Sequence, residues 1–279
     1  MSEHVDIDVL RAIAEDVVRQ AAAMALEGHR HELQVQTKAN RNDLVTRVDK
    51  TIEEFVAAEL TNRTGLPLLG EEAHSVESFS GRVWVLDPID GTMNYVETHR
   101  DYAVSLALVI DGDPVIGVVA DVVAGRLYSA VKGRGAFCHA DQPFGGARPR
   151  ITEPASTVRL EEVPTDKGFR DSILITDLKE IRAMPRLMAA LVESRGHRRY
   201  GSAALECVEV ACGRAGAFIH LWVSPWDVAA ATVICRECGV TVTRLDGTPL
   251  DIRYKGSVLA GAPTAHRELL AKLVSNAEQ

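Results

Sequence analysis

Apolar residues recur every three to four positions at the start of the chain, which predicts an amphipathic helix over residues 8–27. Residues 28–42 are polar and have no such period, so we expect a loop or an exposed hairpin there. A second helical pattern is expected to begin near Asp49 and to end at Gly65, because glycine commonly follows the last turn of a helix.

After residue 65 the pattern changes to short runs rich in β-branched residues. These runs cover residues 83–86, 102–110, 115–123, 126–131 and 136–139. Turn-forming residues separate several of them, for example at residues 111–114 and 124–125. This spacing favours an antiparallel meander.

Strand-like and helix-like patterns alternate in the second half of the chain. The expected strands cover residues 173–176, 198–200, 217–223, 240–245 and 257–260, and the expected helices cover residues 178–194, 202–212, 225–238 and 264–275. Such alternation predicts a layered α/β arrangement.

A chain of 279 residues exceeds one average domain, and its composition contains a candidate boundary. Residues 141–172 contain four of the eleven prolines and several glycines. We therefore expect an α+β domain with an antiparallel sheet at residues 1–150 and an α/β domain at residues 151–279.

Composition and charge exclude several classes of protein. With 46% apolar and 25% charged residues, the chain is typical of a globular protein. The net charge of −8 argues against a nucleic-acid partner, and no apolar stretch approaches the ~20 residues of a membrane helix. The absence of a signal-peptide pattern and the odd number of five cysteines favour a cytoplasmic location. Cys235 and Cys238 lack the second pair that a structural zinc site needs.

The most informative chemistry follows the apolar run at residues 83–86. Asp87 stands at the end of this run and Asp90 three residues later, and Gly91 and Thr92 open a candidate helix whose free N–H groups can hold an anion. Two carboxylates beside an anion-binding turn suit metal-assisted phosphate chemistry. A strand-end turn capped by Asp90 would explain the same segment.

Three further segments join this one in an ordered set of motifs. The four motifs are DLVTxxD at Asp43–Asp49, GEE at Gly70–Glu72, DPIDGTxN at Asp87–Asn94 and WDxA at Trp226–Ala229. Together they resemble the inositol monophosphatase family of magnesium-dependent, lithium-sensitive phosphatases, and the resemblance spans nearly the whole chain. It implies an alternating α-β-α-β-α sandwich of the sugar-phosphatase type.

The resemblance also implies a set of metal ligands. A first Mg²⁺ would be held by Glu71, Asp87 and the carbonyl of Ile89, and a second by Asp87, Asp90 and Asp227. A weaker third ion would involve Glu71 and water, giving two to three ions in each active site. Hard oxygen ligands of this kind suit Mg²⁺. Most of the ligands would belong to the N-terminal domain, and Asp227 to the C-terminal domain.

The same resemblance implies the remaining catalytic roles. The N–H groups of Gly91 and Thr92 would bind phosphate, and Thr92, Glu71 and Asp49 would help to position and deprotonate the attacking water. Lys38 would lie on a lid over the site. The implied activity is that of a Mg²⁺-dependent phosphomonoesterase acting on inositol monophosphate or a related polyol or sugar phosphate, in a homodimer.

Substrate choice is less constrained by these motifs. The substrate-binding positions implied by the resemblance are Asp90, Gly201, Ser202, Ala203, His220 and Asp227. His220 stands where inositol-reading members carry a glutamate, and an imidazole cannot replace a bidentate carboxylate acceptor. A strand histidine without contact to substrate is the alternative. His74 and His99, each isolated in the sequence, are expected to be exposed loop residues.

Two groups of alternatives stay open at the sequence level. Within the same chemistry, fructose 1,6-bisphosphate, NADP or a 3′-phosphonucleotide, and histidinol phosphate are rival substrates. A different class is a non-catalytic regulatory protein that retains the fold. Such a protein would have no reason to keep a cluster of unpaired carboxylates, which is costly when buried.

Overall fold

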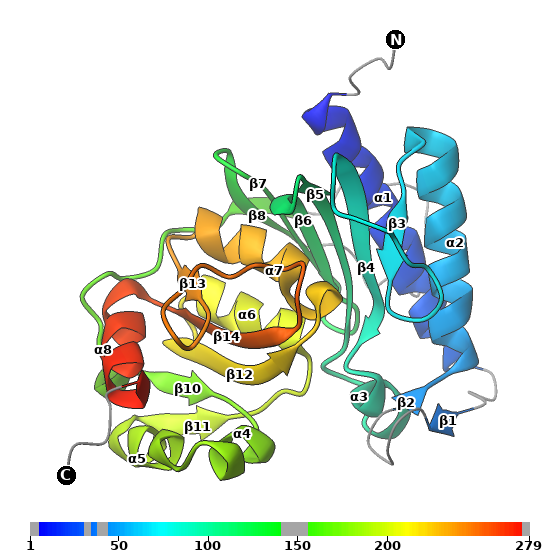
Figure 1. Ribbon diagram of the computed structural model, residues 1–279. Coiled ribbons are helices and arrows are strands. Elements are labelled where there is room, and N and C mark those ends of the chain that lie inside the picture. The colour runs from blue at the N-terminus through cyan, green and yellow to red at the C-terminus, as the bar shows by residue number, and fades with distance from the viewer. Residues whose placement is uncertain (1–5, 31–34, 38–43, 141–155, 275–279) are drawn as a thin grey trace.

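The computed structural model describes residues 6–30, 35–37, 44–140 and 156–274. Two larger sheets and three groups of helices alternate in layers across the molecule (Figure 1). Helices α1 and α2 cover one face of the larger sheet, α6 and α7 lie between the sheets, and α4, α5 and α8 cover the far side of the smaller sheet. The expected α-β-α-β-α sandwich is confirmed.

The two outer helices owe their limits to local capping. Helix α1 (Ile7–Gly28) begins after Asp6, whose carboxylate accepts the N–H of Asp8. Helix α2 (Arg47–Thr64) begins two residues before the predicted Asp49, because the Thr46 hydroxyl caps its first turn. It ends as predicted at Gly65, which has a left-handed φ of 68°.

Among the described residues, the larger sheet contains seven strands in sequence order. They are β3 (Leu68–Gly70), β4 (Arg82–Asp90), β5 (Ala103–Ile110), β6 (Asp113–Asp121), β7 (Arg126–Val131), β8 (Gly135–Ala140) and β9 (Ser156–Arg159). Strands β4 to β8 form the expected antiparallel meander and β9 extends it, whereas β3 pairs with β4 in parallel. Strand β9 was not predicted; it lies beyond residue 150 but completes this sheet.

One hairpin of the meander is tighter than the sequence suggested. We expected residues 111–114 to form the turn, but only Asp111 and Gly112 do so, with φ angles of 51° and 86°. Two successive positive φ angles match the twist of the flanking strands, and Asp-Gly is well suited to them. Pro114 therefore lies inside β6, beside a shift in register with β5.

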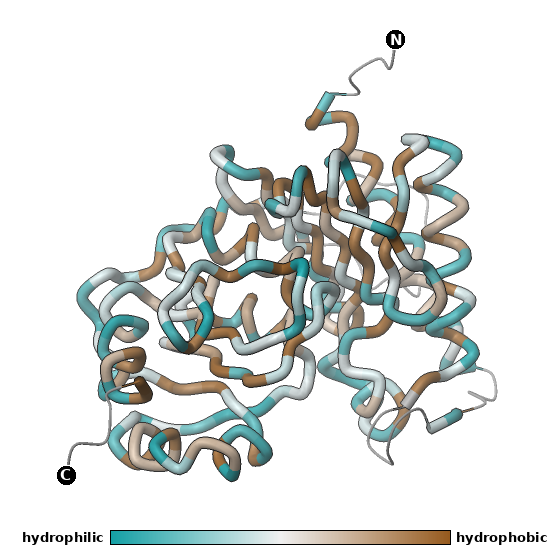
Figure 2. The backbone as a smooth tube through the Cα atoms, in the orientation of Figure 1, coloured by the Kyte–Doolittle hydropathy of each residue, from teal (hydrophilic) through white to brown (hydrophobic). Residues whose placement is uncertain are grey.

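The central strands of the larger sheet are covered on both faces, so β4 to β7 are largely apolar (Figure 2). Alternate residues of β4 enter different cores: Trp84 and Leu86 pack beneath α1 and α2, whereas Val85 faces the central helices. The core that Val85 enters, around the central helices, combines residues from both halves of the chain. The division into two domains at residue 150 stays a prediction.

The smaller sheet is mixed, with the strand order β11-β10-β12-β14-β13. Its strands are β10 (Ile173–Ile175), β11 (Gly196–Arg198), β12 (Ala217–Val223), β13 (Thr241–Thr243) and β14 (Gly256–Gly261). The remaining elements are β1 (Gln36–Thr37), β2 (Leu44–Val45), α3 (Thr92–Glu97), a 3₁₀ turn (Phe169–Asp171), α4 (Leu178–Ala183), α5 (Pro185–Glu193), α6 (Ala203–Ala211), α7 (Pro225–Glu237) and α8 (Pro263–Val274).

The predicted helix at residues 178–194 was wrong in one respect, since it is two helices. Met184 between them has φ −130° and ψ 86°, and Pro185 opens α5. Proline has no N–H to continue a helix and keeps the preceding residue out of the helical region. The strand expected at 198–200 lies two residues earlier, as β11.

The central helix α7 packs very closely on the larger sheet. A Cβ atom added to Gly117 on β6 would lie 2.1 Å from the carbonyl oxygen of Ala230, so this contact requires glycine. Cys235 and Cys238 at the end of α7 are buried free thiols, as expected. No helix in the described part of the chain is both long enough and apolar enough to span a bilayer.

Candidate active site

Five of the predicted site residues lie at the ends of strands and in or near the first turns of helices. These elements come from both halves of the chain. Asp87 and Asp90 lie at the end of β4, and Glu71 follows β3. Asp49 and Asp227 lie in the first turns of α2 and α7. The charges of the other four carboxylates all act on Asp87, so the fold brings this set together.

Asp87 is the member of the carboxylate set on which the charges of all the others act. Its side chain is 2% exposed, and Oδ1 accepts the N–H of Ile89 at 3.1 Å. Burial raises the pKa of Asp87 well above its usual value, and repulsion from Glu71, Asp90 and other carboxylates raises it further. An ionised carboxylate here needs a compensating cation.

Asp90 connects the two halves of the chain. Its Oδ2 accepts the Ser202 hydroxyl at 2.5 Å and the N–H of Ala204 at 2.7 Å, and Oδ1 accepts the N–H of Ala203 at 3.2 Å. Burial raises the pKa of Asp90 to about 6, although these hydrogen bonds oppose the rise. The structure thus places the predicted substrate positions 202 and 203 directly beside a predicted metal ligand.

Asp227 is held by the helix that it opens. Its Oδ2 accepts the N–H of Ser224 at 2.7 Å in a reciprocal capping arrangement at the start of α7. Burial raises the pKa of Asp227 to about 8, and the charge of Asp90 adds to this shift. Asp227 therefore caps α7 through Oδ2, and its role as a metal ligand stays a prediction.

The predicted pair Thr92 and Asp49 is in contact. The Thr92 hydroxyl lies 3.4 Å from Asp49 Oδ1 and 3.1 Å from the carbonyl oxygen of Ile89. The other carboxylate oxygen of Asp49 accepts both the N–H and the hydroxyl of Thr46, at 2.9 and 2.5 Å. Burial raises the pKa of Asp49 to about 6, which leaves a poised proton acceptor beside Thr92.

The chemistry of this cluster suits divalent cations. Its donors are carboxylate oxygens and one backbone carbonyl, which are ligands that Mg²⁺ prefers. Within the ranges that the structure describes, no three His, Cys, Asp or Glu side chains lie close enough together to hold one ion. The donor set consists of buried carboxylates that repel one another, and a divalent cation would neutralise that charge, so the residue types fit the group.

Gly91 lies at a point of close backbone approach. It has φ 93°, and a Cβ atom there would lie 3.1 Å from the carbonyl oxygen of Gly201 and 3.3 Å from that of Asp101. A side chain would therefore be strained and crowded. The predicted phosphate-binding turn and the predicted substrate segment at Gly201 are direct neighbours.

Two residues that sequence reasoning missed hold the predicted substrate segment in place. The buried carboxylate of Glu206 accepts the N–H groups of Tyr200 and Gly201 at 2.6 and 2.8 Å. The Asn94 amide donates to the carbonyl oxygens of Asp101 and Tyr200 at 2.7 and 2.6 Å. For Glu206, the available signal was a glutamate on the apolar face of α6. For Asn94, it was membership of the DPIDGTxN motif.

Replacing Asn94 with alanine is expected to lower the free energy of unfolding by roughly 1–3 kcal/mol, because two carbonyl groups lose their donor. Denaturant unfolding followed by circular dichroism would measure this change. Asn62→Ala, at an exposed position of α2, is the matched control and should be close to neutral. An unchanged midpoint in N94A would show that the segment does not depend on this amide.

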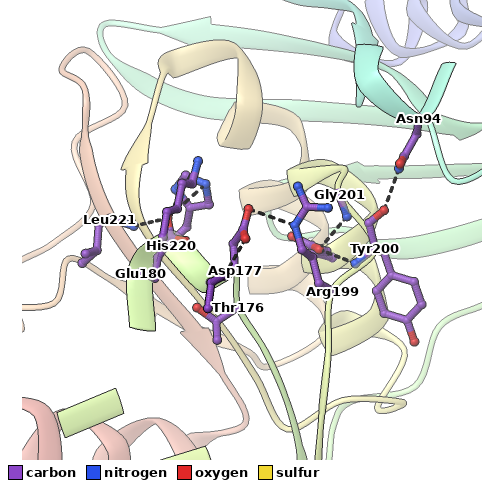
Figure 3. Close-up of polar contacts among 12 residues, drawn as sticks. Asn94, Thr176, Asp177, Glu180, Arg199, Tyr200, Gly201, His220 and Leu221 are labelled. Atoms are coloured by element: carbon purple, nitrogen blue, oxygen red, sulfur yellow. Dashed lines mark hydrogen bonds and ion pairs between the residues drawn. The ribbon is translucent and has the colours of Figure 1, made fainter. Parts of the chain in front are cut away.

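His220 lies on β12 with both ring nitrogens next to protein groups. Nδ1 accepts the N–H of Trp222 at 3.0 Å, and Nε2 lies 3.5 Å from Oε1 of Glu180, a fully buried carboxylate (Figure 3). Burial lowers the pKa of His220 to about 4, so the ring is neutral at pH 7. Contact of His220 with substrate stays a prediction, and Lys38, the predicted lid residue, lies outside the described residues.

Arg199 adds a positive charge at the edge of the substrate segment. Its Nε lies 2.8 Å from Oδ2 of Asp177, and its side chain is half exposed (Figure 3). The guanidinium also lies beside Gly201, since a Cβ atom there would be 3.3 Å from it. This arginine was not among the residues predicted from the sequence.

Comparison with known proteins places the chain within a family. Residues 6–279 match the family model described as the inositol monophosphatase family. The chain is 36% identical to inositol-1-monophosphatase of Bacillus subtilis, covering 92% of this chain and 93% of that protein. It is 37% identical to inositol-1-monophosphatase SuhB of Mycobacterium tuberculosis, covering 95% and 93%.

Solved structures agree with this placement. The fold superposes on inositol monophosphatase II of Staphylococcus aureus with a TM-score of 0.81 at 32% identity, covering 95% of this chain and 93% of that one. The family resemblance seen in the four motifs is confirmed. The chain belongs to the inositol monophosphatase family, and it is an enzyme of the phosphoric monoester hydrolase class.

Proposed function

We propose that the protein is a Mg²⁺-dependent phosphomonoesterase that hydrolyses inositol monophosphate or a related polyol or sugar phosphate. The observation that carries this proposal is the buried carboxylate set around Asp87, next to the contact between Asp90 and the substrate segment. A buried cluster of like charges is costly unless cations occupy it. A regulatory protein would not need to bear that cost.

Ligands in related structures support this chemistry. Relatives with 30–31% identity are described with bound inositol monophosphate and with bound 2′AMP. Others at 26–27% identity are described with Mg²⁺ and phosphate, with NADP and Ca²⁺, and as an inhibitory complex with LiCl. These names motivate the metal, the phosphate ester and the lithium sensitivity that we propose for this chain.

The proposed metal ligands are Glu71, Asp87, the carbonyl of Ile89, Asp90 and Asp227, for two to three Mg²⁺ ions. When bound, Mg²⁺ would neutralise the phosphate and make a bound water more acidic. The charges of the other carboxylates all act on Asp87, so we propose it as the shared ligand. The raised pKa values of Asp90 and Asp227 describe the metal-free site and would fall on binding.

The protein residues are proposed to orient the ester and to accept the proton of the attacking water. The N–H groups of Gly91 and Thr92 would bind the phosphate oxygens. The Thr92 hydroxyl would take the water proton while passing its own to Asp49, which lies 3.4 Å away. Glu71 would position the same water. The deprotonated water would then attack phosphorus while the bond from phosphorus to the ester oxygen breaks. The leaving alkoxide would take a proton from solvent water, and Asp49 would return its proton to solvent.

Substrate selection is proposed to lie at Asp90, Gly201, Ser202, Ala203, His220 and Asp227. As a neutral ring, His220 would meet a hydroxyl or a base rather than a second phosphate. The half-exposed Arg199 favours a second candidate with an additional anionic group, such as NADP, a 3′-phosphonucleotide or fructose 1,6-bisphosphate. Histidinol phosphate is the remaining alternative.

We further propose a homodimer that acts in the cytoplasm on small phosphate esters, without nucleic-acid or membrane partners. The net charge of −8 supports the exclusion of nucleic acids. Light scattering of the purified protein would test the dimer, and a single monomeric species would contradict it.

A panel of these phosphate esters would test the function. With Mg²⁺, we expect phosphate release to be fastest from a polyol monophosphate and to be inhibited by millimolar lithium. The double variant Glu71→Gln with Asp90→Asn supplies the background rate. If no ester is hydrolysed faster than by the double variant, the proposed Mg²⁺-dependent hydrolysis of these esters is wrong for this chain. Rapid hydrolysis that is indifferent to lithium would contradict the lithium prediction alone.

A further inference from the structure

A further buried glutamate, Glu53, lies one helical turn after Asp49 on α2 and is only 1% exposed. Its carboxylate faces the turn after β3. Oε2 accepts the N–H of Glu72 at 2.8 Å, and Oε1 accepts the N–H groups of Ala73 and His74 at 2.7 and 2.9 Å. The ring Nδ1 of His74 also lies 2.8 Å from Oε1. The turn is therefore built around one carboxylate.

The approach of Glu53 leaves no room for a side chain at Gly70. A Cβ atom there would lie 2.3 Å from the Glu53 carboxyl carbon and 2.5 Å from Oε2. The N–H of Gly70 closes the turn by donating to the carbonyl oxygen of His74 at 2.9 Å. The glycine of the GEE motif thus admits the carboxylate, and His74 is a partner of this carboxylate rather than the isolated loop residue that we expected.

Glu53 is held in its charged form. Burial alone would raise its pKa, but the hydrogen bonds from Glu72, His74 and Ala73 outweigh burial and hold the pKa below its usual value. Charge-assisted hydrogen bonds from backbone N–H groups are stronger than neutral ones. The turn is therefore fixed by several strong contacts to a single side chain.

The residue inside this turn is Glu71, which stands between Gly70 and Glu72. Its charge acts on Asp87 and Asp227 across the carboxylate cluster. Since hydrogen bonds from Glu72 and Ala73 fix the backbone on one side of Glu71, and β3 fixes it on the other, Glu53 sets where the Glu71 side chain starts.

We propose that Glu53 is a positioning residue that sets the Mg²⁺ affinity of the site by holding the Glu71 turn. The inference rests on the proposed function, because it takes Glu71 as a metal ligand. Glu53 touches neither substrate nor metal in this account. Groups that orient metal ligands typically change metal affinity by roughly 10–100-fold when they are replaced.

Glu53→Gln is the sharpest variant, because it keeps the shape of the side chain. Its amide nitrogen is a donor, so it would oppose a backbone N–H where Glu53 accepts one. Glu54→Gln is the matched control, since Glu54 is the next residue of the same helix and is exposed. His74→Ala removes one donor and leaves the carboxylate in place, so it should have a smaller effect on Mg²⁺ affinity. It also provides a test if E53Q does not fold.

Isothermal titration of the metal-free protein with Mg²⁺, together with phosphatase assays over a range of Mg²⁺, tests the proposal. We expect E53Q to weaken the dissociation constant roughly 10–100-fold, with kcat recovering to within about threefold of wild type at saturating Mg²⁺. E54Q should match wild type, and H74A should lie between them.

The alternative outcomes separate the two proposals. An E53Q dissociation constant within twofold of wild type overturns the positioning role, as does a loss of binding sites at unchanged affinity, which marks a merely structural role. If E53Q does not fold, an H74A dissociation constant equal to wild type has the same consequence. A wild-type protein that hydrolyses none of the esters instead contradicts the proposed function.

Discussion

Asp87→Asn is expected to reduce kcat/KM by roughly 10³-fold or more while leaving the metal-free protein at least as stable as wild type. The proposed shared ligand would lose its charge, and metal stabilisation of a phosphoryl transition state is worth several kcal/mol, at about tenfold per 1.4 kcal/mol. In the metal-free state the same change removes a buried charge from among carboxylates that repel it.

Both halves of this prediction can be measured on one preparation. Phosphate release at a fixed Mg²⁺ concentration gives the activity, and thermal unfolding in EDTA gives the stability. Asp166→Asn, at an exposed loop position, is the matched control and should change neither. Lost activity with a lowered melting temperature would mean that D87N acts by unfolding the protein, and retained activity would contradict the metal-ligand role.

The stability of the metal-free protein is expected to depend on pH through Asp227. Burial raises the pKa of Asp227 from 3.8 to about 8 in the folded state. Between these values the unfolded chain loses the proton while the folded protein keeps it, so this group destabilises the fold progressively from about pH 4 to about pH 8. Its favourable contribution is fully present only below pH 4.

Comparison with Asp227→Asn isolates this effect, because carboxyl groups with lowered pKa values, such as Asp177, act in the opposite direction. In EDTA, the melting temperature of wild type should fall relative to D227N by roughly 5 °C or more between pH 5 and pH 8. Asparagine can still accept the N–H of Ser224, so the cap of α7 is kept. Parallel curves for the two proteins would refute the raised pKa.

Periodicity located most elements because each of them has a local cause. The stripe of α1, the stop of α2 at Gly65 and the meander from β4 to β8 follow from spacing and turn residues alone. Two errors in the predicted helix boundaries also had local causes. Pro185 divides a helix that periodicity joins, and the Thr46 hydroxyl starts α2 two residues early.

The edges of the larger sheet could not be derived in this way. Strand β9 is exposed along its length and has no apolar alternation, so only pairing with β8 makes it a strand. Strand β4 continues through Asp87 to Asp90 because both residues pair with β5, across a shift in register between them. Tertiary pairing overrides composition in both cases.

The candidate site likewise contains residues that local motifs identify and residues that only the folded structure identifies. The sequence alone identified the carboxylates Glu71, Asp87, Asp90 and Asp227, because their motifs are short and contiguous. It was silent on Glu53 and Glu206, whose hydrogen-bond partners lie on other segments of the chain. A glutamate on a helix is indistinguishable from a solvated one until packing shows which face it occupies.

By itself, the sequence determined the layered fold, the family and the acidic chemistry of the site, since each of these depends on residue type and local spacing. Only the tertiary structure decided which backbone turns Glu53 and Glu206 hold. It also decided that His220 is neutral beside Glu180. The physical reason is that desolvation and hydrogen bonding depend on distances between segments far apart in the chain, and those distances exist only after folding.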